Sequence, residues 1–174
     1  MSEDGRMSNP NALPNASGDA FRLDEKLIAR GIAAAGASAR RRIIMPIHRV
    51  QEARVQRMLN FLQPGTYIRP HLHPLDHASE TICALRGALG FVLFDEAGAV
   101  KETMVLREGG LGVVDIEPRV WHGMVALEAG TVLLEMKQGP YDAATDKIFA
   151  DWAPEEGEAS AENYERALAE RFAR

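Results

Sequence analysis

The sequence predicts an all-β sandwich or barrel with a helix at each end of the chain. The main observation is a series of short, strand-like segments between Thr66 and Lys137, each about four to eight residues long. Glycine-containing turns separate these segments at Gly87, Asp95–Gly98, Gly109-Gly110 and Glu128–Gly130. This spacing is typical of antiparallel sandwiches and barrels, and a jelly roll accommodates the number of segments.

Two amphipathic stretches predict the flanking helices. The first begins after Asp24, a suitable N-cap, places apolar residues at helical spacing and ends near Gly36. The second covers residues 159–172, where Tyr164, Leu168 and Phe172 recur every four residues. The expected organisation is a disordered tail over 1–22, an N-terminal helix over 23–39, a β-barrel over 40–140, and a C-terminal extension over 141–174 with a terminal helix.

Two further segments have less clear patterns. Apolar residues between Glu52 and Leu62 recur at helical spacing, which predicts a helical face there. Residues 141–154 show no regular pattern and are expected to be irregular. The run Arg40–Arg42 fits either a phosphate site or a solvated approach to a strand.

Composition excludes several classes of protein. The 174 residues are enough for one domain with a sizeable core, and the net charge of −5 argues against nucleic-acid binding. The single cysteine, Cys83, excludes an internal disulfide. Neither an early apolar run of signal-peptide length nor a membrane-length stretch is present, so a cytoplasmic protein with no membrane contact is expected.

The most informative stretch is Arg69–Glu80, which contains three of the five histidines. Residues two apart on a strand share a face, so His71 and His73 are expected to point the same way. Glu80 returns from the next segment, and His122 adds an imidazole from a distant one. Three imidazoles and a carboxylate suit iron, manganese, nickel, copper or zinc, and leave coordination positions open.

The same residues carry a resemblance to cupins. Gly65, five residues, His71-x-His73, six residues, Glu80, six residues and Gly87 resemble the first cupin motif, with a spacer after His73 that is longer than usual. The second motif would end at His122. Its usual proline and glycine positions hold Glu117 and Arg119 instead, which affects the expected turn geometry more than the expected ligand.

A finer resemblance, over roughly residues 40–156, is to the WbuC family of cupin-fold metalloproteins. It is carried by Arg69-Pro70-His71 through Glu80, Leu93-Phe94-Asp95, Trp121-His122, Gly139-Pro140-Tyr141, Asp146-Lys147, Phe149-Ala150 and Trp152-Ala153-Pro154. The resemblance implies a cupin jelly roll, one divalent transition metal and a surface-polysaccharide context with a sugar or nucleotide sugar. It also implies that the latter part of Glu52–Leu62 is strand-like rather than helical.

Strand alternation extends the expected site beyond the ligands. Tyr67 and Arg69 would share the inward face with His71, and Arg69 would then bind an anionic group of a ligand. The alternative is that Arg69 turns outward to an acidic surface residue. Glu135, Lys137 and Tyr141 are further contributors whose direction the sequence leaves open, and His77 is either a substitute ligand or a solvated loop residue.

Function follows less directly from these residues. A metal-dependent isomerase or epimerase, a dioxygenase of a small organic acid and a non-catalytic binding module all fit the pattern. The expected partner is a small anionic or sugar-like molecule, and His48, Tyr67 and Glu135 are alternative general bases. The apolar stripes of the two helices also predict a homodimer.

Overall fold

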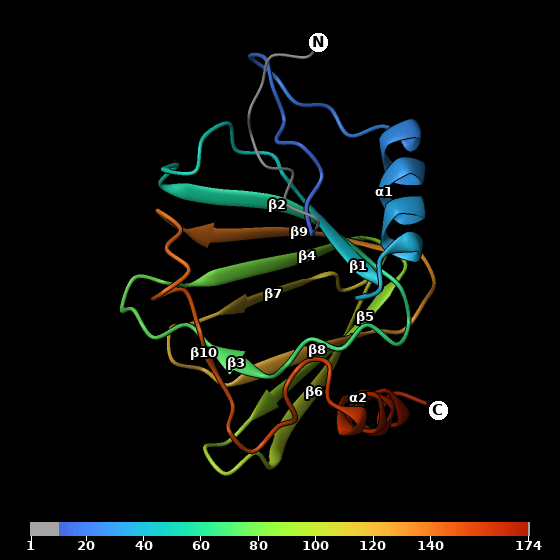
Figure 1. Cartoon of the computed structure of the whole chain (residues 1–174), viewed down its shortest axis with the longest axis vertical. Helices are drawn as coiled ribbons and strands as arrows, with labels where there is room; N and C mark the ends of the chain where they lie inside the picture. Colours follow the sequence, from blue (N-terminus) through green and yellow to red (C-terminus); the bar gives the residue numbers. More distant parts are fainter. Residues whose placement is uncertain (1–10, 174) are drawn as a thin grey trace.

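The computed structural model describes residues 11–173, which form two stacked five-stranded sheets with one helix beside each (Figure 1). The first sheet has the order β1 (Arg42–Pro46), β2 (Val55–Leu62), β9 (Thr131–Gln138), β4 (Glu80–Arg86), β7 (Val113–Ile116). The second has the order β10 (Ile148–Phe149), β3 (His71–Leu72), β8 (His122–Ala126), β5 (Ala88–Phe94), β6 (Val100–Arg107).

The strand pairing is that of a jelly roll. Antiparallel pairs join β2 to β9, β3 to β8, β4 to β7 and β5 to β6, so each pair lies inside the preceding one along the sequence. This nesting is what a long hairpin gives when it is wrapped into two facing sheets. The predicted all-β jelly roll with flanking helices is therefore confirmed.

The space between the sheets is filled by alternate residues of the facing strands. Ile82 of β4, Phe91 of β5 and Leu133 of β9 belong to one buried apolar cluster in this space. Because residues two apart share a face, Glu80 continues the inward face of Ile82, and His122 continues that of Met124. The polar candidates thus lie on the inner walls of the same sandwich.

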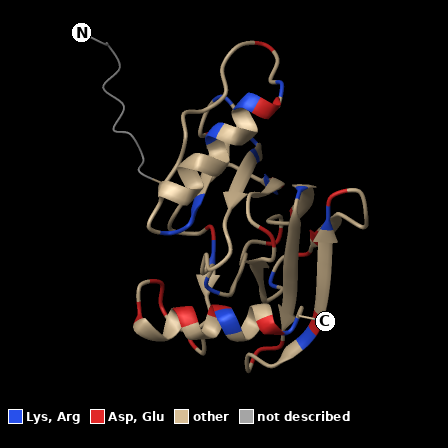
Figure 2. Cartoon of the chain, turned by 90° about the vertical axis from the view of Figure 1, so that its right-hand side faces the viewer, with Lys and Arg blue, Asp and Glu red and all other residues tan. Residues whose placement is uncertain are grey.

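The two helices pack on the outside of their own sheets. Helix α1 (Glu25–Ala37) begins at the predicted N-cap, where Asp24 accepts a hydrogen bond from the Leu27 amide at 2.8 Å, and its apolar face covers β1 and β2. Helix α2 (Ala159–Glu170) packs Leu168 against β5 and β8, and both acidic and basic residues occur along it (Figure 2). The stripes that predicted a homodimer are therefore covered within one chain, and the homodimer stays a prediction.

The segment predicted to have a helical face forms β2 instead, so that prediction is wrong. Leu59 and Phe61 face α1, whereas Leu62 faces the sandwich interior. When a strand is covered on both faces, apolar residues occur at odd and even positions alike. Their spacing can then resemble the spacing of apolar residues on one face of a helix.

Described residues near both ends of the chain contact the sheets. Residues 1–10 of the expected disordered tail lie outside the described residues, but Leu13 and Ala16 donate hydrogen bonds to the carbonyls of Ile44 and Pro46 beside β1. The C-terminal extension, expected to be irregular over 141–154, contributes β10 to the second sheet. The first twelve or so described residues and the extension are therefore part of the domain.

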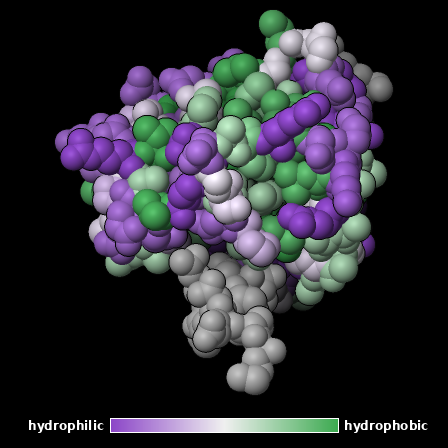
Figure 3. Space-filling view, turned by 90° about the horizontal axis from the view of Figure 1, so that it is seen from above, coloured by the Kyte–Doolittle hydropathy of each residue, from purple (hydrophilic) through white to green (hydrophobic). Residues whose placement is uncertain are grey.

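One face of the described part of the molecule has a mixed surface. Seen from above, polar and apolar residues are interspersed on the described part of the molecule (Figure 3). Among residues 11–173, neither helix has the length and apolar character needed to cross a membrane.

The contact between α1 and β2 gives a stability prediction. A Cβ added to Gly31 would lie 2.3 Å from the Phe61 ring, whereas one added to Gly36 would meet nothing within 4 Å. Alanine improves helix propensity by up to about 1 kcal/mol at either position, but overpacking costs about 1–3 kcal/mol. Urea unfolding should show that Gly31→Ala is less stable than the parent and Gly36→Ala slightly more stable. Equal stability of the two variants would contradict this packing.

Candidate metal centre

Four buried side chains converge between the sheets. His71 lies on β3, His73 directly follows it, and Glu80 and His122 are the first residues of β4 and β8. One ligand atom from each of the four lies within 4.8 Å of every other, and all four residues are buried. Pairing of β3 with β8 sets His71 opposite His122, which brings together two parts of the sequence fifty residues apart. The four predicted ligands therefore form one cluster.

Backbone carbonyls orient each of the three rings. The Nδ1 atoms lie 2.9 Å from the Arg69 carbonyl oxygen for His71, 2.6 Å from that of Asp146 for His73, and 2.9 Å from that of Val120 for His122. Because a carbonyl oxygen only accepts, each Nδ1 carries a proton, and Nε2 is the ring nitrogen left to bind an ion once it is deprotonated. This is the arrangement that holds metal-binding histidines in proteins.

Three of the four ligand atoms have no hydrogen-bond partner among the described residues. Glu80 Oε2 lies 3.4 Å from His73 Nε2 and 3.3 Å from His122 Nε2, and within residues 11–173 none of these three buried atoms makes a hydrogen bond. A buried polar atom without a partner costs about 1–3 kcal/mol. A divalent ion bound by three nitrogens and one oxygen would satisfy all of them, so the residues fit the predicted transition metal.

The protonation states also suit a metal. Burial lowers the pKa of His71 well below its usual value, and the charge of Lys147 lowers it further, so the ring is neutral. Burial raises the pKa of Glu80, but the His122 and His73 rings outweigh burial and hold that pKa well below its usual range. A carboxylate and a neutral imidazole are the forms that bind metal ions.

The turn before β8 departs from the cupin motif, as expected, but still delivers the ligand. Arg119 occupies the usual glycine position and has a φ of 65°, a left-handed conformation that glycine adopts more easily. Its amide donates to the His73 carbonyl at 2.8 Å. That bond ties the turn to the first motif, so His122 reaches the cluster without the glycine.

A second carboxyl, Glu135, lies on the inner face of β9 and faces Glu80. The Asn60 amide donates to Glu135 Oε2 at 2.9 Å. Burial raises the pKa of Glu135 to about 8, and the negative charge of Glu80 adds to this effect. Glu135 is therefore a neutral carboxyl at neutral pH. Its side chain faces the interior of the sandwich, an orientation that the sequence had left open.

An ion pair on the same strand face was missed by the sequence reasoning. Lys137 and Asp146 are both buried and form an ion pair, and the Asp146 carbonyl oxygen is the one that holds the His73 ring. Burial lowers the pKa of Lys137, but the negative charge that Glu135 carries when it is ionised and the Asp146 carboxylate outweigh burial and raise it. The only signal for Asp146 was its place in the string that resembles the WbuC family.

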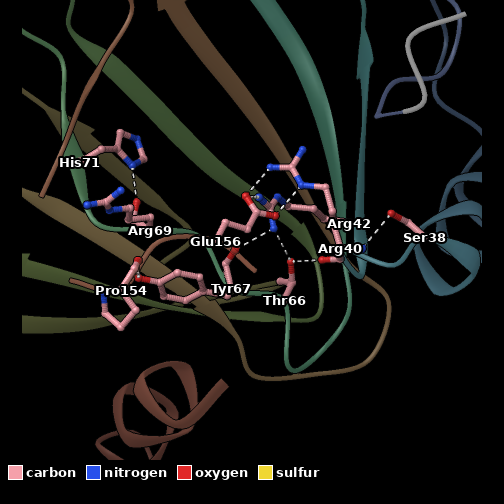
Figure 4. A network of polar contacts seen from close by, with 9 residues as sticks. All are labelled: Ser38, Arg40, Arg42, Thr66, Tyr67, Arg69, His71, Pro154 and Glu156. Carbon is pink, nitrogen blue, oxygen red and sulfur yellow. Dashed lines mark hydrogen bonds and ion pairs between the residues drawn. The ribbon is translucent and has the colours of Figure 1, made fainter. Parts of the chain in front are cut away.

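The predicted ligand-binding residues, Tyr67 and Arg69, contact the C-terminal extension. Arg69 donates to the Ala150 carbonyl from Nε at 3.0 Å and from Nη2 at 2.7 Å. Tyr67 donates to the Pro154 carbonyl at 2.7 Å (Figure 4). Arg69 Nη1 also lies 3.4 Å from Oε1 of the exposed Glu155, which is the pairing with an acidic surface residue that the alternative expected. These donors are thus engaged by this chain. A role for either in binding a ligand stays a prediction.

The arginine run, residues 40–42, also contacts the C-terminal extension. Arg40 and Arg42 form ion pairs with Glu156 at 2.6 and 2.8 Å, and Arg42 also donates to the Tyr67 carbonyl (Figure 4). These contacts favour neither the phosphate site nor the solvated run. They attach the extension to the start of β1.

The two remaining histidines lie outside the four-residue cluster. His77 is exposed in the loop between β3 and β4, which fits the solvated alternative. His48 is buried, and its Nδ1 lies 2.9 Å from the Arg57 carbonyl oxygen and 3.1 Å from the Arg57 amide.

Part of the chain matches a known sequence family. Residues 23–106 match a family described as "Domain of unknown function (DUF6016)". No curated protein matches the chain. The WbuC resemblance is not confirmed by these matches and stays a prediction.

Solved structures with a similar arrangement include three oxalate enzymes. Oxalate decarboxylase of Lactobacillus farciminis in a formate complex has 20% identity and a TM-score of 0.44, over 55% of this chain and 26% of that one. The Bacillus subtilis oxalate decarboxylase has 20% identity and a TM-score of 0.45, over 56% and 24%. An oxalate oxidase in complex with the substrate analogue glycolate has 15% identity and a TM-score of 0.46, over 69% and 64%. The chain spans about a quarter of the length of the two decarboxylases, and its own fold assignment rests on the strand pairings.

Proposed function

We propose that this protein binds one divalent transition metal ion through His71, His73, Glu80 and His122, and that the ion in turn binds a small anionic or sugar-like molecule. The observation that carries the proposal is the convergence of four buried ligand residues, three of which direct atoms without hydrogen bonds at one another. When bound, such an ion supplies a Lewis acid with open coordination positions.

The charges around the cluster favour an anionic ligand. Glu80 cancels one of the two positive charges of a divalent ion, and Lys137 and Asp146 cancel one another. The ion and its four ligands alone therefore carry a net charge of about +1 in a buried setting, where an anion is attracted more strongly than in water.

The sugar context comes from the WbuC resemblance, which implies surface polysaccharide. Isomerisation or epimerisation of a sugar, dioxygenation of a small organic acid, and binding without catalysis would all use the same four ligands. Glu135, the neutral carboxyl beside Glu80, is the general acid or base that the surroundings support best.

The test is direct metal binding. Protein stripped with a chelator should bind about one Zn²⁺, Mn²⁺ or Fe²⁺ ion per chain in a calorimetric titration. At a free metal concentration about 100 times the Kd, the free energy of unfolding should rise by about 2.7 kcal/mol. A chain that takes up none of these ions and shows no stabilisation would refute the proposal. Light scattering on the same samples tests the predicted homodimer.

A further inference from the structure

The C-terminal extension places one aromatic side chain beside a metal ligand. Phe149 of β10 pairs with His71 of β3, and the Ala150 amide donates to the Pro70 carbonyl at 2.9 Å, which fixes this register. Residues directly opposite on antiparallel strands have side chains on the same face. The Phe149 ring therefore stands on the His71 side of the sheet, with the two ring centroids 6.1 Å apart.

This ring is not a core residue. Phe149 is 49% exposed, although it lies next to a histidine that is 4% exposed. The Arg69 guanidinium lies 5.7 Å from the centroid of the Phe149 ring. The neighbouring Ile148 is similarly exposed but pairs with Leu72, so its side chain lies on the opposite face of the sheet. Phe149 thus offers free aromatic surface at the edge of the candidate metal centre.

The same segment brings an ammonium group to the centre. The Nζ atom of Lys147 has an ion-pair contact with Asp146 Oδ2 at 3.5 Å, while the other oxygen of that carboxylate contacts Lys137. The Lys147 side chain is 33% exposed, so it keeps donors for a further partner. The backbone carbonyl of Asp146 lies 2.6 Å from the His73 ring nitrogen, so Lys147 is held beside the residue that orients one metal ligand. Lys147 and Phe149 therefore lie in one short segment that contacts the ligands His73 and His71.

We propose that Lys147 and Phe149 form a ligand subsite beside the metal ion, for a small carboxylate that carries a ring or another flat apolar body. The inference rests on the proposed metal centre and narrows its ligand class. The carboxylate is attracted by the net positive centre and by Lys147. The apolar body covers the free half of the Phe149 ring, an aromatic contact worth about 0.5–1.5 kcal/mol, or roughly threefold to tenfold in affinity.

Cobalt-loaded protein provides the test, because Co²⁺ reports ligands through its visible spectrum as well as through calorimetry. The probes are acetate, benzoate, benzyl alcohol and inorganic phosphate. Benzoate should bind roughly threefold to tenfold more tightly than acetate, and benzyl alcohol should not bind. Phe149→Ala should reduce benzoate affinity to that of acetate, and Phe149→Leu should give an intermediate value. Lys147→Gln should weaken both carboxylates about tenfold, the loss expected for one charge-assisted hydrogen bond.

Ile148→Ala is the matched control, because Ile148 is equally exposed on the adjacent residue but faces the other way. It should leave the preference for benzoate unchanged. The inference is overturned if parent protein that has bound cobalt shows no preference for benzoate, if Phe149→Ala keeps that preference, or if phosphate binds more tightly than both carboxylates. A parent chain that takes up no cobalt refutes the metal centre itself, and with it the subsite.

Discussion

The His71→Ala/His73→Ala double variant should purify with less than about a tenth of the metal held by the parent. Removing both imidazoles leaves Glu80 and His122, and two ligands do not hold a transition metal against a chelator. The effect is large because the rings are pre-oriented by the Arg69 and Asp146 carbonyls, so the parent loses little freedom when it binds the ion. Elemental analysis of protein purified without added ions measures the difference.

The control for this experiment is His77→Ala. His77 lies in the same stretch of sequence, but it is exposed and outside the cluster, so its loss should leave the metal content unchanged. Circular dichroism of the double variant checks that the sheet has formed. Full metal content in a folded double variant would show that the ion binds elsewhere.

The second large effect is expected for Lys137→Met, which should lower the free energy of unfolding by about 3–5 kcal/mol. Lys137 and Asp146 are 6% and 7% exposed at their side chains, and methionine leaves the Asp146 carboxylate buried with only the 3.5 Å contact of Lys147. The double variant Lys137→Met/Asp146→Asn should recover part of the loss, because it removes the uncompensated charge as well. Urea unfolding of metal-free protein measures both values.

An exposed ion pair provides the comparison for Lys137→Met. Arg107 and Glu128 also form an ion pair, but their side chains are 53% and 45% exposed. Glu128→Ala should therefore cost no more than about 1 kcal/mol. If Lys137→Met is as mild as Glu128→Ala, the Lys137–Asp146 pair is accessible to water in solution.

The four ligands could be predicted from two features of the sequence: the short spacing of the first two histidines, and the strand pattern that follows Glu80 and His122. His71 and His73 are two residues apart, and Glu80 and His122 each begin a strand with an apolar inner face. The neighbours of the cluster were harder to place. Glu135 and Lys137 lie on β9, which is covered on both faces. Alternation in hydrophobicity therefore does not show which alternate set of its side chains points into the sandwich.

The expectation for Arg69 shows a different limit. Alternation places Arg69 on the His71 face only if the strand extends back through it, yet β3 begins at His71. Before that point Pro70 interrupts the ladder, and the side chain is free to reach Ala150. No local pattern in the sequence links position 69 to position 150, because that contact depends on how the C-terminal extension crosses the sheet.

The contacts of the C-terminal extension determine when the site is complete during synthesis. The carbonyl that orients His73 is 73 residues further along the chain, and the carboxylate that binds Arg40 is 116 residues further. A ribosome delivers the N-terminal part first, so all four metal ligands leave it before Asp146 does. A nascent chain that has exposed only residues up to His122 holds its ligands without the group that fixes one of their rings. Capture of the ion in its final geometry therefore belongs to the last stage of folding, after the extension has reached β3.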